Sequence, residues 1–310
     1  MKISLLFLLS LWLGAAHANT ELSAAIENVR ATCGNISAEL NDLKKMAGIT
    51  TTVTGVGTVA GGVALGTGLA KANVDKEIAD LKQQLAEQDL TRPLEQVTIS
   101  AQNLKESLNE YQTSIQTPST SELQEQKSEA EQKSHKLGNI RTGALATATA
   151  TNIAGAIMSG NNRVQGDLKQ QIDECLLSVK TLSNVRMQAR IDGSTNDAEL
   201  ARAENIIRAC DAWSAVDITP INNRSTGATV SAGIGAGLGL AGTITSASAN
   251  SKDIRVGDDE QREKNLNTAA NVLAGGTTVA SAAATIFNAT QINAIKRAAM
   301  VADECAGALK

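Results

Sequence analysis

The sequence has very few aromatic residues and prolines, and this scarcity limits the folds that it can adopt. Aromatic residues make up 2% of the chain, and there are 3 prolines. A core of large aromatic side chains is therefore excluded, and the core must be built from Ala, Val, Ile, Leu, Gly and Thr. Because prolines are so few, the chain has few obligatory breaks. Long helices that approach one another closely are expected.

The sequence also lacks the residue sets that catalysis, metal binding and nucleic-acid binding require. The net charge of −4 argues against a nucleic-acid partner, because such binding needs clustered Lys and Arg. His135 lies in a polar run that is typical of a solvated helix face. We therefore predict no catalytic, cofactor-binding or metal site and no small-molecule substrate, and we do not expect an enzyme.

The first 18 residues have the pattern of a secretory signal peptide. Lys2 gives a positive start, residues 3–14 form an apolar run, and Ala16-His17-Ala18 is a small-x-small cleavage site. An apolar run this short does not span a bilayer. We expect an exported protein of the periplasm, the cell envelope or the extracellular space.

The two halves of the chain resemble each other. Asp173-Glu174-Cys175 in the first half has a counterpart in Asp303-Glu304-Cys305 in the second, and a tract of small residues precedes each. Two further tracts of small residues follow Cys33 and Cys210. Two copies of one unit is the economical explanation.

The apolar periodicity between the tracts predicts helices. Eight residues from Leu22 to Ala47 recur at steps of 4 and 3, which is a heptad seam. We predict an all-α fold of two tandem helical hairpins, each with a Gly/Ala/Thr-rich seam, coiled-coil-like flanks and one disulfide. The predicted segments are a signal peptide (1–18), repeat 1 (19–190), a linker (191–200) and repeat 2 (201–310).

The four cysteines predict two disulfides, because an even count in an exported protein implies pairing. Sequence alone allows three pairings. If each hairpin has arms of equal length, folding them antiparallel brings the two cysteines of one repeat level. This geometry favours Cys33–Cys175 and Cys210–Cys305.

Repeat 1 differs from repeat 2 by a long insertion between its tracts, at about residues 72–137. Residues 94–115 carry a heptad seam, and Ser119-Thr120-Ser121-Glu122 fits a capping box that starts a new helix. We predict a coiled-coil arm that binds a partner protein or a second copy through residues 94–115.

Glycines spaced by four recur in two of the tracts, and this spacing stacks small residues on one helix face. Glycine costs about 1 kcal/mol against alanine in a helix interior, so a close contact or a membrane must compensate. The tracts resemble the glycine-zipper segments of membrane and pore proteins, which implies close helix packing. The predicted packing residues are Gly57, Gly61, Gly62, Gly66, Gly233, Gly235, Gly237 and Gly239.

Three interpretations of the tracts remain open at the level of sequence. They could be transmembrane helical hairpins, since they are about 20 residues long and carry few charges. They could form a soluble, self-associating structural or adhesion module with coiled-coil arms. They could also be Thr/Val-rich β-structure. We expect a non-enzymatic protein that inserts into or organises a membrane, with the soluble module as the alternative.

Overall fold

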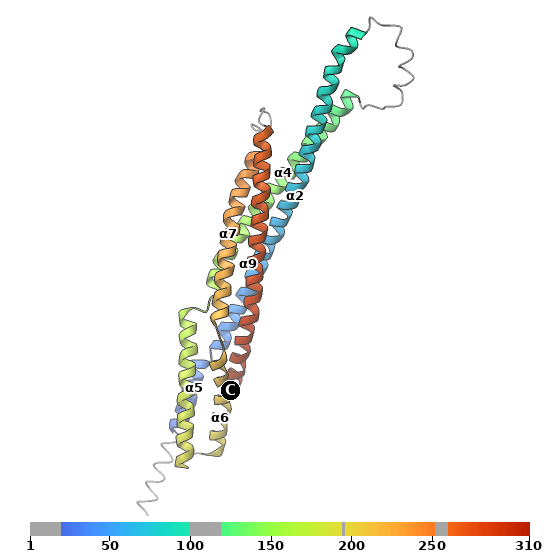
Figure 1. The fold of residues 1–310 in the computed structure, drawn as a ribbon. Coiled ribbons are helices and arrows are strands. Elements are labelled where there is room, and N and C mark those ends of the chain that lie inside the picture. The colour runs from blue at the N-terminus through green and yellow to red at the C-terminus, as the bar shows by residue number, and fades with distance from the viewer. Residues whose placement is uncertain (1–19, 99–118, 194–195, 252–259) are drawn as a thin grey trace, which may run out of the picture. The chain divides into compact units, whose positions relative to one another are not determined.

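The computed structural model describes residues 20–98, 119–193, 196–251 and 260–310, and these residues form helices and connecting turns without a strand (Figure 1). Residues 20–33 are helical. They precede α2 (Ile36–Thr98), α4 (Thr120–Asn161), α5 (Gly166–Asp192), α6 (Asp197–Asp211), the 3₁₀ helix η1 (Ala212–Ala215), α7 (Thr219–Ala249) and α9 (Glu260–Ala308).

The predicted all-α fold is confirmed. The β interpretation of the small-residue tracts is wrong, because the four tracts lie within α2, α4, α7 and α9. Threonines in the tracts donate their hydroxyls to carbonyls one turn earlier in their own helix, as Thr51 does to Ala47 and Thr243 to Gly239. The predicted signal peptide and residues 99–115 of the predicted partner-binding seam lie outside the described residues.

The helix ends follow local sequence signals. Ser119 and Glu122 form the predicted capping box: the Ser119 N–H donates to Glu122 Oε2 at 2.7 Å, and the Glu122 N–H donates to Ser119 Oγ at 3.3 Å. Gly193 ends α5 in the left-handed conformation, with a φ of 63°. Asp217 accepts from the Thr219 N–H at the start of α7, and hydrogen bonding from Thr219 lowers the pKa of its carboxyl group.

The chain divides into two compact units. Unit 1 comprises residues 1–55, 153–233 and 282–310, and unit 2 comprises residues 56–152 and 234–281. Helices α2, α4, α7 and α9 each contribute residues to both units. Since each unit draws on both halves of the chain, compactness does not separate the two repeats, whose boundaries stay a prediction.

Unit 1 has a core of large apolar side chains. The predicted seam from Leu22 to Ala47 is buried here apart from the half-buried Leu43, and it packs against the buried stripe of α5 that runs from Leu168 to Leu182. Trp213 of η1 closes this core and is 1% exposed. A core of this kind is what a water-soluble domain requires.

Unit 2 is a four-helix arrangement with a core of small residues. Gly57 and Gly68 of α2 lie against Thr151 and Arg141 of α4, so these two helices run antiparallel. The apolar cluster at the centre consists of Ala64, Leu145 and Ala274, with Leu65 and Ala144 partly buried beside it. The helices can therefore approach closely, but they bury few large apolar side chains.

Candidate functional site

The centre of unit 2 contains polar side chains that bond to one another. Asn152 of α4 donates from Nδ2 to Ser281 Oγ of α9 at 2.8 Å, and the Ser281 hydroxyl lies 3.0 Å from Asn152 Oδ1. Both side chains are fully buried. Thr149 and Thr277 are buried on the same two helices and donate to carbonyls of their own helix. The buried polar atoms thus find partners within the protein.

Two glycines bring neighbouring helices of unit 2 into close contact at equivalent places. An added Cβ on Gly61 would lie 2.7 Å from Thr278 Oγ1 and 3.1 Å from its Cα. An added Cβ on Gly239 would lie 2.5 Å from Thr149 Oγ1. In both cases, the first tract of one half packs on the second tract of the other half. Gly57 and Gly235 are also in close contact, with Thr151 and Asn152.

The other four predicted packing glycines lie elsewhere on the helix surface. Within the described residues, nothing lies within 4 Å of a Cβ built on Gly62, Gly66, Gly233 or Gly237. The glycines spaced by four therefore lie on two different faces of α2, and likewise on two faces of α7. One face contacts neighbouring helices, and the other is open.

A charged cluster in unit 2 joins α2, α4 and α9. Lys71 of α2 is fully buried, and its Nζ lies 2.7 Å from Asp75 Oδ2 and 3.3 Å from Glu263 Oε1 of α9. Ser134 of α4 donates to Asp75 Oδ1 at 2.6 Å. The two carboxylates are about one-quarter exposed, so the cluster reaches the surface on their side.

Arg141 extends this cluster and is fully buried. Its Nε donates to Ser246 Oγ of α7 at 2.8 Å, one Nη to Asn267 Oδ1 at 2.7 Å and the other to Asn271 Oδ1 at 3.2 Å. Asn267 in turn donates to Asp75 at 3.2 Å. The planar guanidinium uses its fixed donor geometry to hold α4, α7 and α9 together.

Along the small-residue tracts, the outer surface of the unit 2 helices is apolar, whereas residues 72–87 and 119–136 expose many charged side chains. Val59, Val272 and Val279 are each more than two-thirds exposed. Every helix of the unit contributes such residues, and charged side chains are absent between Val56 and Ala70. The exposed large apolar residues of unit 2 are Val56, Val59, Val63, Leu69, Ile140, Ile234, Leu240, Ile244, Val272 and Val279.

The same four helices expose apolar residues in unit 1 as well. Ile157 of α4 and Ile286 of α9 are more than 60% exposed. The others on these helices are Met46, Ile49, Ile153, Val230, Phe287 and Met300. Buried positions nearby are polar: Asn162 donates to Thr50 Oγ1 at 2.8 Å, and both side chains are buried.

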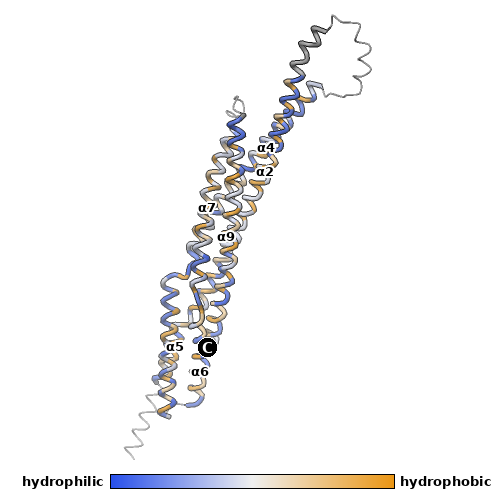
Figure 2. The backbone as a smooth tube through the Cα atoms, in the orientation of Figure 1, coloured by the Kyte–Doolittle hydropathy of each residue, from blue (hydrophilic) through white to orange (hydrophobic). Residues whose placement is uncertain are grey.

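Three helical segments of the described chain are long and apolar enough to cross a membrane, judged by length and composition. They are Thr20–Glu87, Thr219–Ala249 and Gln261–Ala308. About one-third or less of the most apolar stretch of each is buried inside the protein. Figure 2 shows that hydrophilic residues of α9 gather at its start, before its small-residue tract.

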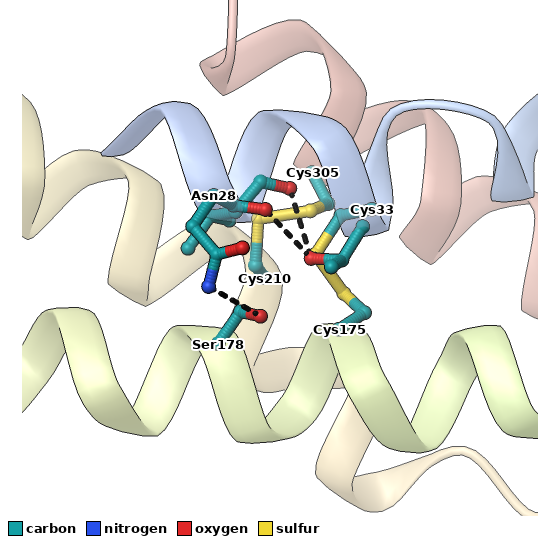
Figure 3. The surroundings of a disulfide bond; sticks show 8 residues. Asn28, Cys33, Cys175, Ser178, Cys210 and Cys305 are labelled. Atoms are coloured by element: carbon teal, nitrogen blue, oxygen red, sulfur yellow. Dashed lines mark hydrogen bonds between the residues drawn. A yellow bond between two sulfur atoms is a disulfide. The ribbon is translucent and has the colours of Figure 1, made fainter. Parts of the chain in front are cut away.

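The four cysteines form two disulfides in unit 1, Cys33–Cys175 and Cys210–Cys305, which is the pairing favoured by the sequence. Figure 3 shows the two bonds lying beside each other. The sulfurs of Cys33, Cys210 and Cys305 lie within 4.8 Å of one another. Because these sulfurs are oxidised, they are not the thiolates that a metal ion would need.

The sequence interpretation did not single out the charged cluster. Lys71 and Arg141 each border an apolar tract, and a basic residue at such a border is a sequence feature that could have pointed to the cluster. The predicted solvated position of His135 agrees with its contact to Asn139, 3.0 Å away on the exposed side of α4. Comparison with protein-family models, curated proteins and solved structures finds no match for this chain.

Proposed function

We propose that this is an exported, non-enzymatic membrane protein that inserts the tracts of α2, α4, α7 and α9 into a bilayer as one helical bundle. The observation that carries the proposal is the inverted polarity of unit 2 along its small-residue tracts. Its buried positions hold Asn152, Ser281, Arg141 and Lys71, while valines such as Val59 and Val279 face outward. Water favours the opposite distribution, whereas a bilayer favours this one.

The distribution of the apolar surface favours lipid over a single protein partner. Exposed large apolar residues occur on all four helices of unit 2, not on one face. Soluble monomers rarely expose contiguous apolar patches of more than a few hundred Å². A partner protein would cover one side of the unit, but lipid covers every side.

Helix α4 explains why the tracts would insert together. It is not among the three helices that are apolar enough to cross a membrane alone. Its polar residues Thr149 and Asn152 are covered by the other helices of unit 2. An unpaired polar group in hydrocarbon costs several kcal/mol, so α4 gains most from entering the membrane with its partners in place.

The contacts also support the proposed duplication. In the Gly61–Thr278 contact, the first tract of the first half packs on the second tract of the second half. In the Gly239–Thr149 contact, the first tract of the second half packs on the second tract of the first half. The hydrogen bonds Asn152–Ser281 and Ser159–Asn288 both join residues 129 positions apart, with Asn and Ser interchanged. We propose that the two hairpins are tandem repeats that pack through glycine-zipper-like seams.

A soluble, self-associating module is the second candidate, and one observation favours it. Gly62 and Gly66 on α2, together with Gly233 and Gly237 on α7, have no neighbour inside the described chain. Small residues at this spacing allow another helix to approach. A second copy of the chain could supply that helix in water or in a membrane.

The proposal is tested by cell fractionation with an alkaline wash of the membrane pellet. The protein should remain in the pellet and require detergent for release. Val279→Lys should shift it to the soluble fraction or block insertion, because lysine at the centre of a membrane helix costs about 2.5–3.5 kcal/mol. In the soluble alternative, a lysine at this 70% exposed position would be harmless.

Ile191→Lys is the matched control, because Ile191 is 76% exposed on α5, outside the tracts. This variant should fractionate as the unchanged protein does. Release of the unchanged protein by the alkaline wash, with both lysine variants behaving like it, would contradict membrane insertion.

A further inference from the structure

The stretches of unit 1 that border its exposed apolar residues carry an excess of basic residues. Within residues 43–55, 153–166, 218–233 and 282–302 there are six basic residues and no acidic residue. They are Lys44, Lys45, Arg163, Arg224, Lys296 and Arg297. We call these six residues the basic collar.

The remainder of unit 1 has the opposite balance. Outside those stretches, its described residues include fifteen acidic and eight basic side chains. The basic residues are thus concentrated in the four stretches, although Asp42, Asp167, Asp217 and Asp303 directly flank them. The collar is therefore a feature of one level of the unit.

Side-chain contacts place the collar at one level. Gln291 of α9 donates to the carbonyls of Asn162 and of Ile221, and Asn162 donates to Thr50 of α2. These four residues thus form one layer that joins α2, the end of α4, the start of α7 and α9. Each collar residue lies within six positions of a member of this layer. On a helix, that is less than two turns, or about 9 Å. Asp167 and Asp217 also lie within six positions of a member, so this level carries six basic and two acidic side chains.

Most of the collar side chains are available to a ligand. Lys45, Arg163, Lys296 and Arg297 are exposed, and Lys44 is half-buried. Arg224 is less available to a ligand, because it donates to the Thr290 carbonyl at 2.7 Å. Within the described residues, none of the four exposed collar side chains forms an ion pair.

Exposed apolar residues lie directly beside the same layer. Ile49 precedes Thr50, and Ile157 and Ile286 lie five positions from Asn162 and Gln291 on their helices. Long basic side chains next to an apolar surface can lay their stems along it and extend their charges outward. This combination suits the boundary between the acyl chains and the headgroups of a bilayer.

We infer that the basic collar binds the headgroup phosphates of an anionic phospholipid bilayer. This inference rests on the proposed membrane insertion and names the lipid that the inserted protein prefers. Basic residues near an anionic membrane surface each strengthen binding, and salt screens the attraction. The protein should therefore prefer anionic over zwitterionic membranes, and the preference should weaken as ionic strength rises.

The test is flotation of the purified full-length mature protein with two kinds of vesicle. One contains phosphatidylcholine alone, and the other contains phosphatidylcholine mixed with phosphatidylglycerol. The unchanged protein should bind the mixed vesicles at least about tenfold better. Changing Lys45, Arg163, Lys296 and Arg297 together to Gln should abolish that difference while leaving binding to phosphatidylcholine intact.

The control removes the same charge elsewhere in unit 1, by changing Lys180, Arg190, Arg202 and Arg208 to Gln on α5 and α6. These residues are exposed, and the control should retain the anionic preference. Circular dichroism of both variants checks that helix content is unchanged. Substitution of the four collar residues by the other basic residue, Lys for Arg and Arg for Lys, should preserve the preference.

Each remaining outcome has a definite meaning. Equal binding to both vesicle types, insensitive to the collar, would overturn the inference but leave membrane insertion standing. Binding to neither vesicle type would overturn both. If inorganic phosphate abolished the preference more strongly than chloride at equal ionic strength, the collar would be a site for free phosphate, and the lipid inference would be wrong.

Discussion

Asn152 and Ser281 come from different halves of the chain and meet as a hydrogen-bonded pair at the centre of unit 2, with Asn152 Nδ2 2.8 Å from Ser281 Oγ. Neither side chain is exposed. In water, two apolar residues would be the usual occupants of such a position. Their presence is consistent with a bundle in which side-chain hydrogen bonds, not burial of large apolar groups, join the helices.

Replacing either member of this pair should destabilise unit 2. Asn152→Ala and Ser281→Ala should each lower the free energy of unfolding by about 1–3 kcal/mol, because each removes the buried hydrogen bond that joins α4 to α9. The double variant should lose less than the sum of the two. A double-mutant cycle in detergent should give a coupling of about 0.5–2 kcal/mol. Strict additivity would show that the pair does not form.

Neighbouring glycines on α2 should respond oppositely to the same substitution. Gly61→Ala should destabilise the protein by about 1–3 kcal/mol, because the added methyl group meets the backbone of Thr278 at 3.1 Å. Gly62→Ala has open space and should stabilise the helix by about 0.4–1 kcal/mol. Thermal unfolding followed by circular dichroism measures both.

Gly239→Ala and Gly237→Ala repeat the experiment on α7, where the first residue contacts Thr149 and the second has open space. A loss of stability at Gly62 and Gly237 equal to that at Gly61 and Gly239 would mean that both faces are covered. The open faces would then be contact surfaces between copies of the chain.

Arg141→Lys should weaken the charged cluster although it keeps the charge. Lysine cannot donate in the fixed directions by which Arg141 reaches Ser246, Asn267 and Asn271 together. A hydrogen bond to a charged group contributes about 1.5–3 kcal/mol, and we expect a loss of that size. Denaturant unfolding is the measurement, with Lys133→Arg on the exposed part of α4 as the control. An unchanged denaturant midpoint for Arg141→Lys would show that the fixed donor geometry of the guanidinium group does not contribute to stability.

Much of the helical architecture follows from local sequence. The heptad seam from Leu22 to Ala47 becomes a buried face, and the Ser119–Glu122 capping box begins α4, because each signal acts within a few residues. The glycine spacing was less decisive. It could not tell Gly61 from Gly62, since which face meets a neighbour depends on the packing of helices far apart in the sequence.

The position of Lys71 and Arg141 at tract borders is the one sequence signal of the charged cluster. Its burial, and that of the polar side chains at the centre of unit 2, could not be predicted for the same reason. Lys71, Arg141 and Asn152 look like surface residues when each is considered within its own helix. Their burial arises only when four helices assemble. The hydropathy of a single helix averages over its inner and outer faces and so conceals the inversion between them.

The proximity of the two disulfides predicts that Cys175→Ser and Cys33→Ser differ. Removing Cys175 frees Cys33, whose sulfur lies within 4.8 Å of those of Cys210 and Cys305. The Cys33 thiolate can attack that bond, form a disulfide with one sulfur and release the other as a thiolate. Peptide mapping without reductant, after alkylation at low pH, should detect Cys33–Cys210 or Cys33–Cys305 in this variant. The rate at which it appears should rise with pH as the thiol ionises.

Cys33→Ser frees Cys175 instead, whose sulfur is outside that group of three. This variant should retain Cys210–Cys305 as its single disulfide at every pH. Both variants lose one bond that closes a long loop, so each should lose about 2–5 kcal/mol of stability. The difference between them therefore reports the position of the freed sulfur, not the loss of the cross-link. If Cys175→Ser also kept Cys210–Cys305 alone, the sulfurs would not lie close enough to exchange.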